Sequence, residues 1–224
     1  MTEFAKELRA GTKKSHTMVE STGFMAGFLR GVVNKEQYSK LVTNFYFVYR
    51  AMEDEIYRLR KHPVVGKIYF PPLERIPQLE KDMEYFYGSD WRNLIAPSEA
   101  CQKYVNRIRE VSDEQPELLI AHHYTRYLGD LSGGQILKGI AANAMGIEEG
   151  LSFYDFPQIA DVKGFKESYR TILDALSLTT SQQNAIIVEA NYAFRLNMYM
   201  FDELEGNELK SLIKMVCGFI KKWN

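Results

Sequence analysis

The stretch Tyr124-Thr125-Arg126-Tyr127-Leu128-Gly129-Asp130-Leu131-Ser132-Gly133-Gly134-Gln135 is the most informative part of this 224-residue chain. Apolar residues around it recur at helical spacing, from Pro116, which suits a first helical turn, to Gly146, which suits a helix end. The glycines therefore lie in mid-helix, where each costs about 1 kcal/mol relative to alanine. Gly129 and Gly133 share one helix face and leave it without side chains, and the helix can kink there.

Two interpretations fit this bare face. Small residues allow two helices to pack closely, which would make the face structural. Alternatively, a planar ligand approaches the backbone, with Arg126 and Asp130 as polar groups at its edge. The spacing alone leaves both open. The string as a whole, however, closely resembles the distal-helix motif of the heme oxygenases.

Composition restricts the class of protein. The chain is 46% hydrophobic and 13% aromatic, enough for one sizeable core, and its net charge of −1 gives no reason to expect nucleic acid as a partner. Cys101 and Cys217 are far apart and form no metal-ligand pair. No secretory leader and no membrane-spanning window is visible, so we expect a protein of a reducing compartment without a membrane anchor: cyanobacterial or phage-infected cytoplasm, or plastid stroma.

The remaining segments also have helical spacing, and strand alternation is absent. Asn34 with Gln37, and Thr180 with Gln183, match the capping box that begins a helix. We therefore predict an all-α fold with a single domain over residues 1–224. The expected helices cover about 2–20, 24–29, 34 to before Pro63, 77–87, 98–111, 116–146, 162–176, 180–204 and 207–222.

One of the four histidines, His16, stands out. At about 100° per residue, Arg9, Lys13, His16 and Glu20 fall along one stripe of the first helix. An imidazole can bind iron while a carboxylate one turn away orients the ring. Taken alone, however, such a stripe is more typical of a solvated basic face with a surface histidine. His122 and His123 are rival ligands, for which we expect a core or surface role, and His62 before Pro63 is expected to be structural.

The resemblance extends over most of residues 3–206. Gly11-Thr12-Lys13-Lys14-Ser15-His16-Thr17 with Glu20 resembles the family's proximal helix, which implies that His16 is the axial ligand and that Glu20 orients it. Asp130 matches the distal aspartate that anchors a water network beside the iron-bound oxygen, and Tyr49, Arg126 and Asn197 match its other members. The resemblance further implies heme contacts at the bare face (Gly129, Gly133), along the distal helix (Thr125, Ser132), at the propionate edge (Arg9, Lys13, Tyr124, Lys166, Arg170) and along the pocket wall (Met25, Phe28, Phe194, Phe201); for the wall residues plain core packing is an equal alternative.

The implied function is oxidative opening of heme b, which is both substrate and cofactor. Dioxygen and reductant would convert it to biliverdin IX-alpha, carbon monoxide and ferrous iron. Ferredoxin is the expected reductant, docking on a basic patch formed by Lys6, Arg9, Lys13, Lys14, Lys163 and Lys166, and a bilin reductase is a possible consumer of the product. A heme-binding protein without catalysis and a ligand-free helical interaction protein are the alternatives.

Overall fold

The computed structural model describes residues 4–221, with side chains described as far as residue 205. No residue in this range lies in a strand, which confirms the all-α prediction. The elements in chain order are α1 (Phe4–Glu20), α2 (Gly23–Leu29), α3 (Lys35–Arg58), η1 (Val65–Ile68), η2 (Pro71–Leu73), α4 (Ile76–Tyr87), α5 (Trp91–Leu94), α6 (Glu99–Glu114), η3 (Pro116–Leu118), α7 (Leu119–His123), η4 (Tyr124–Leu128), α8 (Gly129–Met145), η5 (Ser152–Tyr154), α9 (Val162–Asp174) and α10 (Thr180–Lys221).

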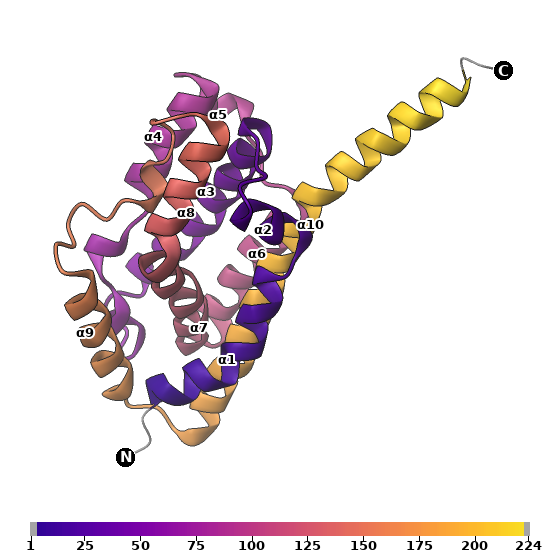
Figure 1. The fold of residues 1–224 in the computed structure, drawn as a ribbon. Coiled ribbons are helices and arrows are strands. Elements are labelled where there is room, and N and C mark those ends of the chain that lie inside the picture. Colours follow the sequence, from indigo (N-terminus) through magenta and orange to yellow (C-terminus); the bar gives the residue numbers. More distant parts are fainter. Residues whose placement is uncertain (1–3, 222–224) are drawn as a thin grey trace.

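The long helix α10 organises the packing. In Figure 1, α1 runs along it, and α2, α6 and α7 also pack against it. The helices α4 and α6 pack on α3, and α9 packs on α1. Buried apolar residues from α1 through α10 form one cluster, which is the large core that the composition predicts. None of the described helices combines the length and apolar character needed to cross a membrane.

Several helix ends follow the predicted signals. The Asn34 side chain accepts a hydrogen bond from the backbone N–H of Gln37 at 2.9 Å, and the reciprocal bond of the capping box is also present. Gly88 and Gly146 follow α4 and α8 with φ of 76° and 62°. Residues other than glycine rarely adopt a positive φ, so glycine ends the helix at both positions, as predicted.

The predicted helix start at Thr180 is confirmed, but two other predictions for the last helices are wrong. The capping box of α10 is Thr179 with Gln182, because Thr179 Oγ1 accepts from the Gln182 N–H at 3.2 Å and Gln182 Oε1 accepts from the Thr179 N–H at 2.9 Å. The pair Thr180 and Gln183 fits the same pattern one residue later, so the sequence pattern alone does not choose between them. The predicted break near residue 206 is also absent, since α10 continues to Lys221 and a single glycine weakens a helix without ending it. Side chains of the segment predicted as 207–222, with Cys217, lie outside the described residues.

Two buried charged residues fix the loop that follows α8. The Asp82 carboxylate accepts hydrogen bonds from the backbone N–H groups of Ser152 and Phe153, both at 2.7 Å. Arg75 donates to the Phe153 carbonyl at 3.1 Å, and its guanidinium stacks 3.5 Å from the ring centre of Phe156. These contacts hold the loop against α4, and Gln135 of α8 donates to the Tyr154 carbonyl at 2.9 Å, so the loop also contacts the helix that carries the glycines.

Candidate active site

The predicted central helix is not one regular α-helix. It begins with η3 and α7, passes through a π-helical turn at η4, and continues as α8 from Gly129. The irregular turn therefore lies immediately before the glycines, close to the expected kink. A π-turn accommodates an extra residue and often marks a functional site.

The glycines of α8 have two different surroundings. A Cβ placed at Gly129 or Gly133 would meet no atom of the described chain within 4 Å, whereas one at Gly134 would lie 3.5 Å from Tyr154 Cδ1. Close packing therefore explains Gly134, which faces the anchored loop. It does not explain Gly129 and Gly133, so the helix-packing interpretation is wrong for these two positions, and the space in front of them is open.

Next to the open face lies a buried polar network. The Tyr49 hydroxyl donates to the Asp130 carboxylate. Arg126 donates through Nε to the Tyr49 hydroxyl at 3.1 Å, through one terminal nitrogen to Asn197 Oδ1 at 2.9 Å, and through the other to Asp130 at 3.3 Å. The four residues come from α3, η4, α8 and α10, and the structure brings them together. The spacing of Arg126 and Asp130, four residues apart, is also typical of an ion pair on a helix surface. Their side chains are only 9% and 12% exposed, so they do not form such a surface pair.

Burial sets the protonation of this network. Desolvation raises the pKa of Asp130, although the positive charge of Arg126 and the hydrogen bond from Tyr49 oppose the rise. Desolvation also raises the pKa of the Tyr49 hydroxyl. Burial alone would lower the pKa of Arg126, but the neighbouring Tyr49 and Asp130 reverse the effect and raise it. The arrangement is therefore a carboxylate held among fixed donors, with Arg126 permanently charged.

The structure also shows a buried carboxyl group, Glu53, that the sequence analysis did not predict as part of the site. Glu53, one turn after Tyr49 on α3, accepts hydrogen bonds from the Tyr127 hydroxyl at 3.1 Å and from the Arg75 N–H at 2.5 Å. Burial raises the pKa of Glu53 to about 7. The i, i+4 spacing of Tyr49 and Glu53 was an available signal, because it places both side chains on one face of the helix. The link from Glu53 to Arg75 is long-range and left no such pattern.

The proximal candidate, His16, is accessible. Its Nδ1 lies 3.6 Å from Glu20 Oε1, and the two side chains are 56% and 53% exposed. The imidazole also packs edge-on against Phe194 of α10, with ring centres 5.8 Å apart. The ring is thus oriented on one side by a carboxylate and supported by an aromatic ring, and Nε2 remains the nitrogen available for a metal.

Two of the basic candidates lie beside Tyr124, and a third contacts α8. Arg9 and Arg170, from α1 and α9, lie near enough to Tyr124 to oppose the rise in its pKa that burial causes. The Lys166 ammonium lies 3.4 Å from the hydroxyl of Ser132 on α8. Lys13 is exposed on α1. Basic residues of α1 and α9 therefore lie beside the central helix, at Tyr124 and at Ser132.

The predicted wall residues are mostly in the core. Phe28, Phe194 and Phe201 are buried, and Met25 is partly buried against the core. Thr125 is also buried, and its hydroxyl has no hydrogen-bond partner. Packing accounts for Phe28 and Phe201, whose rings each contact Phe24.

The rival histidines are engaged elsewhere. His122 Nε2 lies 3.1 Å from Glu189, and His123 Nδ1 lies 2.7 Å from the Tyr169 hydroxyl; both rings are buried. Burial lowers the pKa of His123 to about 3. His62 Nδ1 accepts from the N–H groups of Val64 and Val65, a structural contact within its own turn. None of the three faces an open ligand space.

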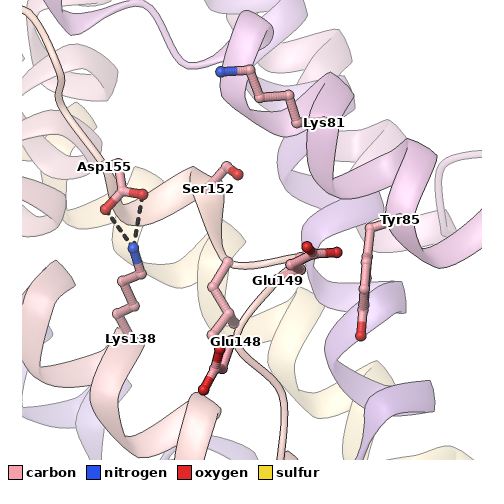
Figure 2. Close-up of a pocket in the computed structure, with 9 residues that line it drawn as sticks. Lys81, Tyr85, Lys138, Glu148, Glu149, Ser152 and Asp155 are labelled. Carbon is pink, nitrogen blue, oxygen red and sulfur yellow. Dashed lines mark hydrogen bonds and ion pairs between the residues drawn. The ribbon is translucent and has the colours of Figure 1, made fainter.

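A separate cavity of about 270 Å³ lies between α4, the end of α8 and the loop at 148–155 (Figure 2). The ion pair of Lys138 with Asp155 closes one side of it, with both contacts at 2.7 Å. Its lining includes none of the predicted site residues. The described residues also contain no cluster of three or more histidine, cysteine or acidic side chains that could bind a metal by themselves.

The fold and this site define the class: an all-α protein whose glycine-lined helix leaves room for a flat ligand beside a buried carboxylate–guanidinium network. Comparison with known proteins gives the family. The heme oxygenase family model matches residues 2–203. A heme oxygenase 1 of Nostoc is 53% identical over 97% of this chain and 92% of its own length, and a heme oxygenase of the red alga Porphyra purpurea is 49% identical over 100% and 95%. The crystal structure of heme oxygenase-1 from the cyanobacterium Synechocystis, in complex with heme, matches with a TM-score of 0.92 at 51% identity, covering 98% of this chain and 100% of that one. The chain belongs to the heme oxygenase family.

Proposed function

We propose that this protein is a heme oxygenase that opens heme at the alpha-meso carbon, yielding biliverdin IX-alpha, carbon monoxide and ferrous iron. The observation that carries the proposal is the open space over Gly129 and Gly133 directly beside the assembled network of Tyr49, Asp130, Arg126 and Asn197. Heme, as the substrate, supplies the iron centre at which dioxygen is activated and the ring that is cleaved. The protein supplies binding, orientation and protons.

The proximal side of the proposal rests on His16. A neutral imidazole binds iron through one ring nitrogen when the other is oriented by a hydrogen-bonding partner. Glu20 Oε1 lies 3.6 Å from Nδ1, beyond hydrogen-bond distance but near enough to orient the ring by its charge, which leaves Nε2 for the iron. Phe194 supports the ring from α10. A freely solvated surface histidine would have neither contact.

On the distal side, Asp130 is proposed to deliver protons through water. Its carboxylate already accepts from Tyr49 and Arg126 and is partly exposed, so a remaining oxygen lone pair can hold a water molecule at the open face. A proton relayed by such a water reaches the oxygen without direct contact by a strong acid or base. Direct contact would favour splitting the oxygen–oxygen bond over attack on the ring.

Regiochemistry is proposed to follow from the basic edge. Arg9 and Arg170 lie beside Tyr124, and Lys166 lies beside Ser132. Together with Lys13 they would hold the two carboxylates of the heme at one edge. Fixing that edge fixes which meso carbon lies next to Asp130. Arginine at residue 9 can bind a carboxylate through two parallel hydrogen bonds, which lysine cannot do.

The reductant and the fate of the product are further parts of the proposal. The packing of α9 on α1 brings together the two helices that carry Arg9, Lys13, Lys14, Lys163 and Lys166, and an acidic ferredoxin would fit this patch. The cyanobacterial and red-algal relatives agree with a role in bilin synthesis, with a bilin reductase consuming the product. A heme carrier without catalysis would not need the buried distal network, so we prefer the enzyme.

The test is a turnover experiment. Protein is mixed with hemin, a reductant and oxygen, and the Soret band, biliverdin absorbance and carbon monoxide are followed. We expect a 1:1 hemin complex that converts to biliverdin, and a His16→Ala variant that loses the axial-ligand spectrum. Hemin binding without pigment or carbon monoxide would indicate a carrier, and no Soret band at all would reject heme as the ligand.

A further inference from the structure

One amide side chain makes hydrogen bonds between α10 and the helix that carries His16. Asn191 of α10 donates through Nδ2 to the Gly11 carbonyl of α1 at 3.1 Å and to its own helix at the Ile187 carbonyl at 2.8 Å. Its Oδ1 accepts from the Ser15 hydroxyl at 2.5 Å. Ser15 is the residue immediately before His16, and Gly11 lies one turn earlier.

These contacts are possible because the two helices approach closely at Gly11. A Cβ at this position would lie 2.6 Å from Ile187 Cγ2, which is too short for any real contact. The approach brings the backbone of α1 within reach of a short side chain on α10. A two-point attachment, with points one turn apart, opposes both sliding of α1 along α10 and rotation of α1 about its own axis.

The same helix also reaches the distal side of the site. Asn197, six residues after Asn191, accepts from Arg126 at 2.9 Å and donates to the Ala193 carbonyl at 2.8 Å. Phe194 lies between them in the chain and contacts the His16 ring. Within about 120° of its circumference, α10 therefore contacts the proximal helix, the imidazole and the distal network in succession.

We propose that Asn191 is a positioning residue for His16, and that α10 acts through Asn191 and Asn197 to set the proximal ligand and the distal network at a fixed separation. The proposal rests on the proposed function, in which His16 binds the heme iron. Asn191 touches neither the imidazole nor the space for heme; it acts by holding the turn that carries the ligand. Since misplacement of a reacting group by about 1 Å can cost roughly 100-fold in rate, a loosened turn affects turnover before it affects binding.

The experiment compares substitutions at both ends of the attachment. Asn191→Ala removes both contacts with α1, Ser15→Ala removes only the hydroxyl, and Ser15→Thr keeps a hydroxyl. Asn106→Ala is the matched control, because Asn106 also accepts a side-chain hydrogen bond, from Gln102 at 2.8 Å, but lies on α6 in an exposed position. Each is measured as the hemin complex by the iron–histidine stretching band of the reduced form and by the rate of biliverdin formation.

We expect Asn191→Ala and Ser15→Ala to bind hemin but to show a shifted and broadened iron–histidine band. Their biliverdin rates should fall, roughly tenfold for Asn191→Ala. Ser15→Thr and Asn106→Ala should match the parent protein. A purely structural role would lower thermal stability and leave the band unchanged. If Asn191→Ala fails to fold by circular dichroism, the pair Ser15→Ala and Ser15→Thr decides.

The outcomes separate the two proposals. If His16→Ala leaves the parent spectrum intact, the ligand assignment itself is wrong, and with it the proposed function. If His16→Ala abolishes the band but the Ser15→Ala and Asn191→Ala complexes keep the parent band and rate, the positioning role of Asn191 is refuted while the proposed function stands.

Discussion

Replacing Gly133 by alanine is expected to change the stability of the ligand-free protein and its affinity for heme in opposite directions. A Cβ at residue 133 meets no atom of the described chain within 4 Å, so the added methyl group requires no repacking. Alanine is favoured over glycine inside a helix by about 1 kcal/mol. The ligand-free variant should therefore be more stable by about that amount, equivalent to a rise of roughly 2–4 °C in melting temperature for a domain of this size.

Heme affinity should fall in the same variant. If the porphyrin lies against the bare face, the methyl group occupies space that the ring needs. We expect the dissociation constant for hemin to rise at least about tenfold, which is about 1.4 kcal/mol. A substitution that stabilises the protein but lowers its affinity for the ligand is expected where glycine allows a ligand to approach the backbone closely, and not where glycine allows helices to pack.

Gly139 provides the matched control. It lies on the same helix, and its Cβ would also meet no described atom within 4 Å, but at 100° per residue it faces about 120° away from Gly133. Gly139→Ala should stabilise the protein equally and leave hemin binding unchanged. Urea unfolding of the ligand-free proteins and hemin titration at the Soret band measure the two effects. Equal hemin affinity in both variants would refute the ligand role of the Gly133 face, and a loss of stability in Gly133→Ala would show that the space is not open.

Three further predictions concern the network, a buried carboxyl and a helix start. Asp130→Asn should still bind hemin but form biliverdin roughly 100-fold more slowly, because an amide cannot hold a proton-relaying water as a carboxylate does; initial rates with matched hemin occupancy test this, and an undiminished rate would exclude the assigned role. Glu53 has a folded pKa of about 7 against an ordinary 4.5, so the folded state holds its proton more tightly and the free energy of unfolding should fall as pH rises from 4.5 to 7, by up to about 3 kcal/mol. In Glu53→Gln that part of the pH dependence should vanish, as urea unfolding at several pH values would reveal, and an unchanged profile would contradict the raised pKa. Thr179→Ala should destabilise the protein by about 1 kcal/mol through loss of the α10 cap, whereas Thr180→Ala should have little effect in the same thermal melts.

Local chemistry made much of the fold predictable. Asn34 with Gln37, Gly88 and Gly146 determine helix ends through contacts within a few residues, so the sequence carries the whole signal. The start of α10 shows the limit of such signals, because two overlapping threonine–glutamine pairs satisfy one pattern. The sequence analysis predicted that the helix can kink at the glycines, but it did not predict the π-turn at Tyr124–Leu128. Apolar spacing over five residues does not distinguish a π-turn from an α-helical turn.

The site was likewise predictable only in part. Motif resemblance pointed to Asp130, Arg126, Tyr49 and Asn197, and the structure brings these side chains into one hydrogen-bonded group. The burial of Arg126 and Asp130 was not predictable, because their i, i+4 spacing is also typical of an ion pair on a helix surface. Contacts between distant segments, such as Glu53 with Arg75 and Asn191 with Ser15, leave no periodic trace in a single sequence.

The π-turn has a consequence for which insertions and deletions the helix can accept. It closes one turn with one residue more than an α-helical turn uses, so it holds an extra residue without changing the phase of the helix on either side. Deleting one residue within Tyr124–Leu128 would therefore convert the turn to ordinary helix while His122 and His123 stay in the core and Gly129 and Gly133 still face open space. The same deletion between Gly129 and Gly133 would rotate the two glycines apart by about 100°, so the π-turn is where this helix best accepts a change of one residue in length.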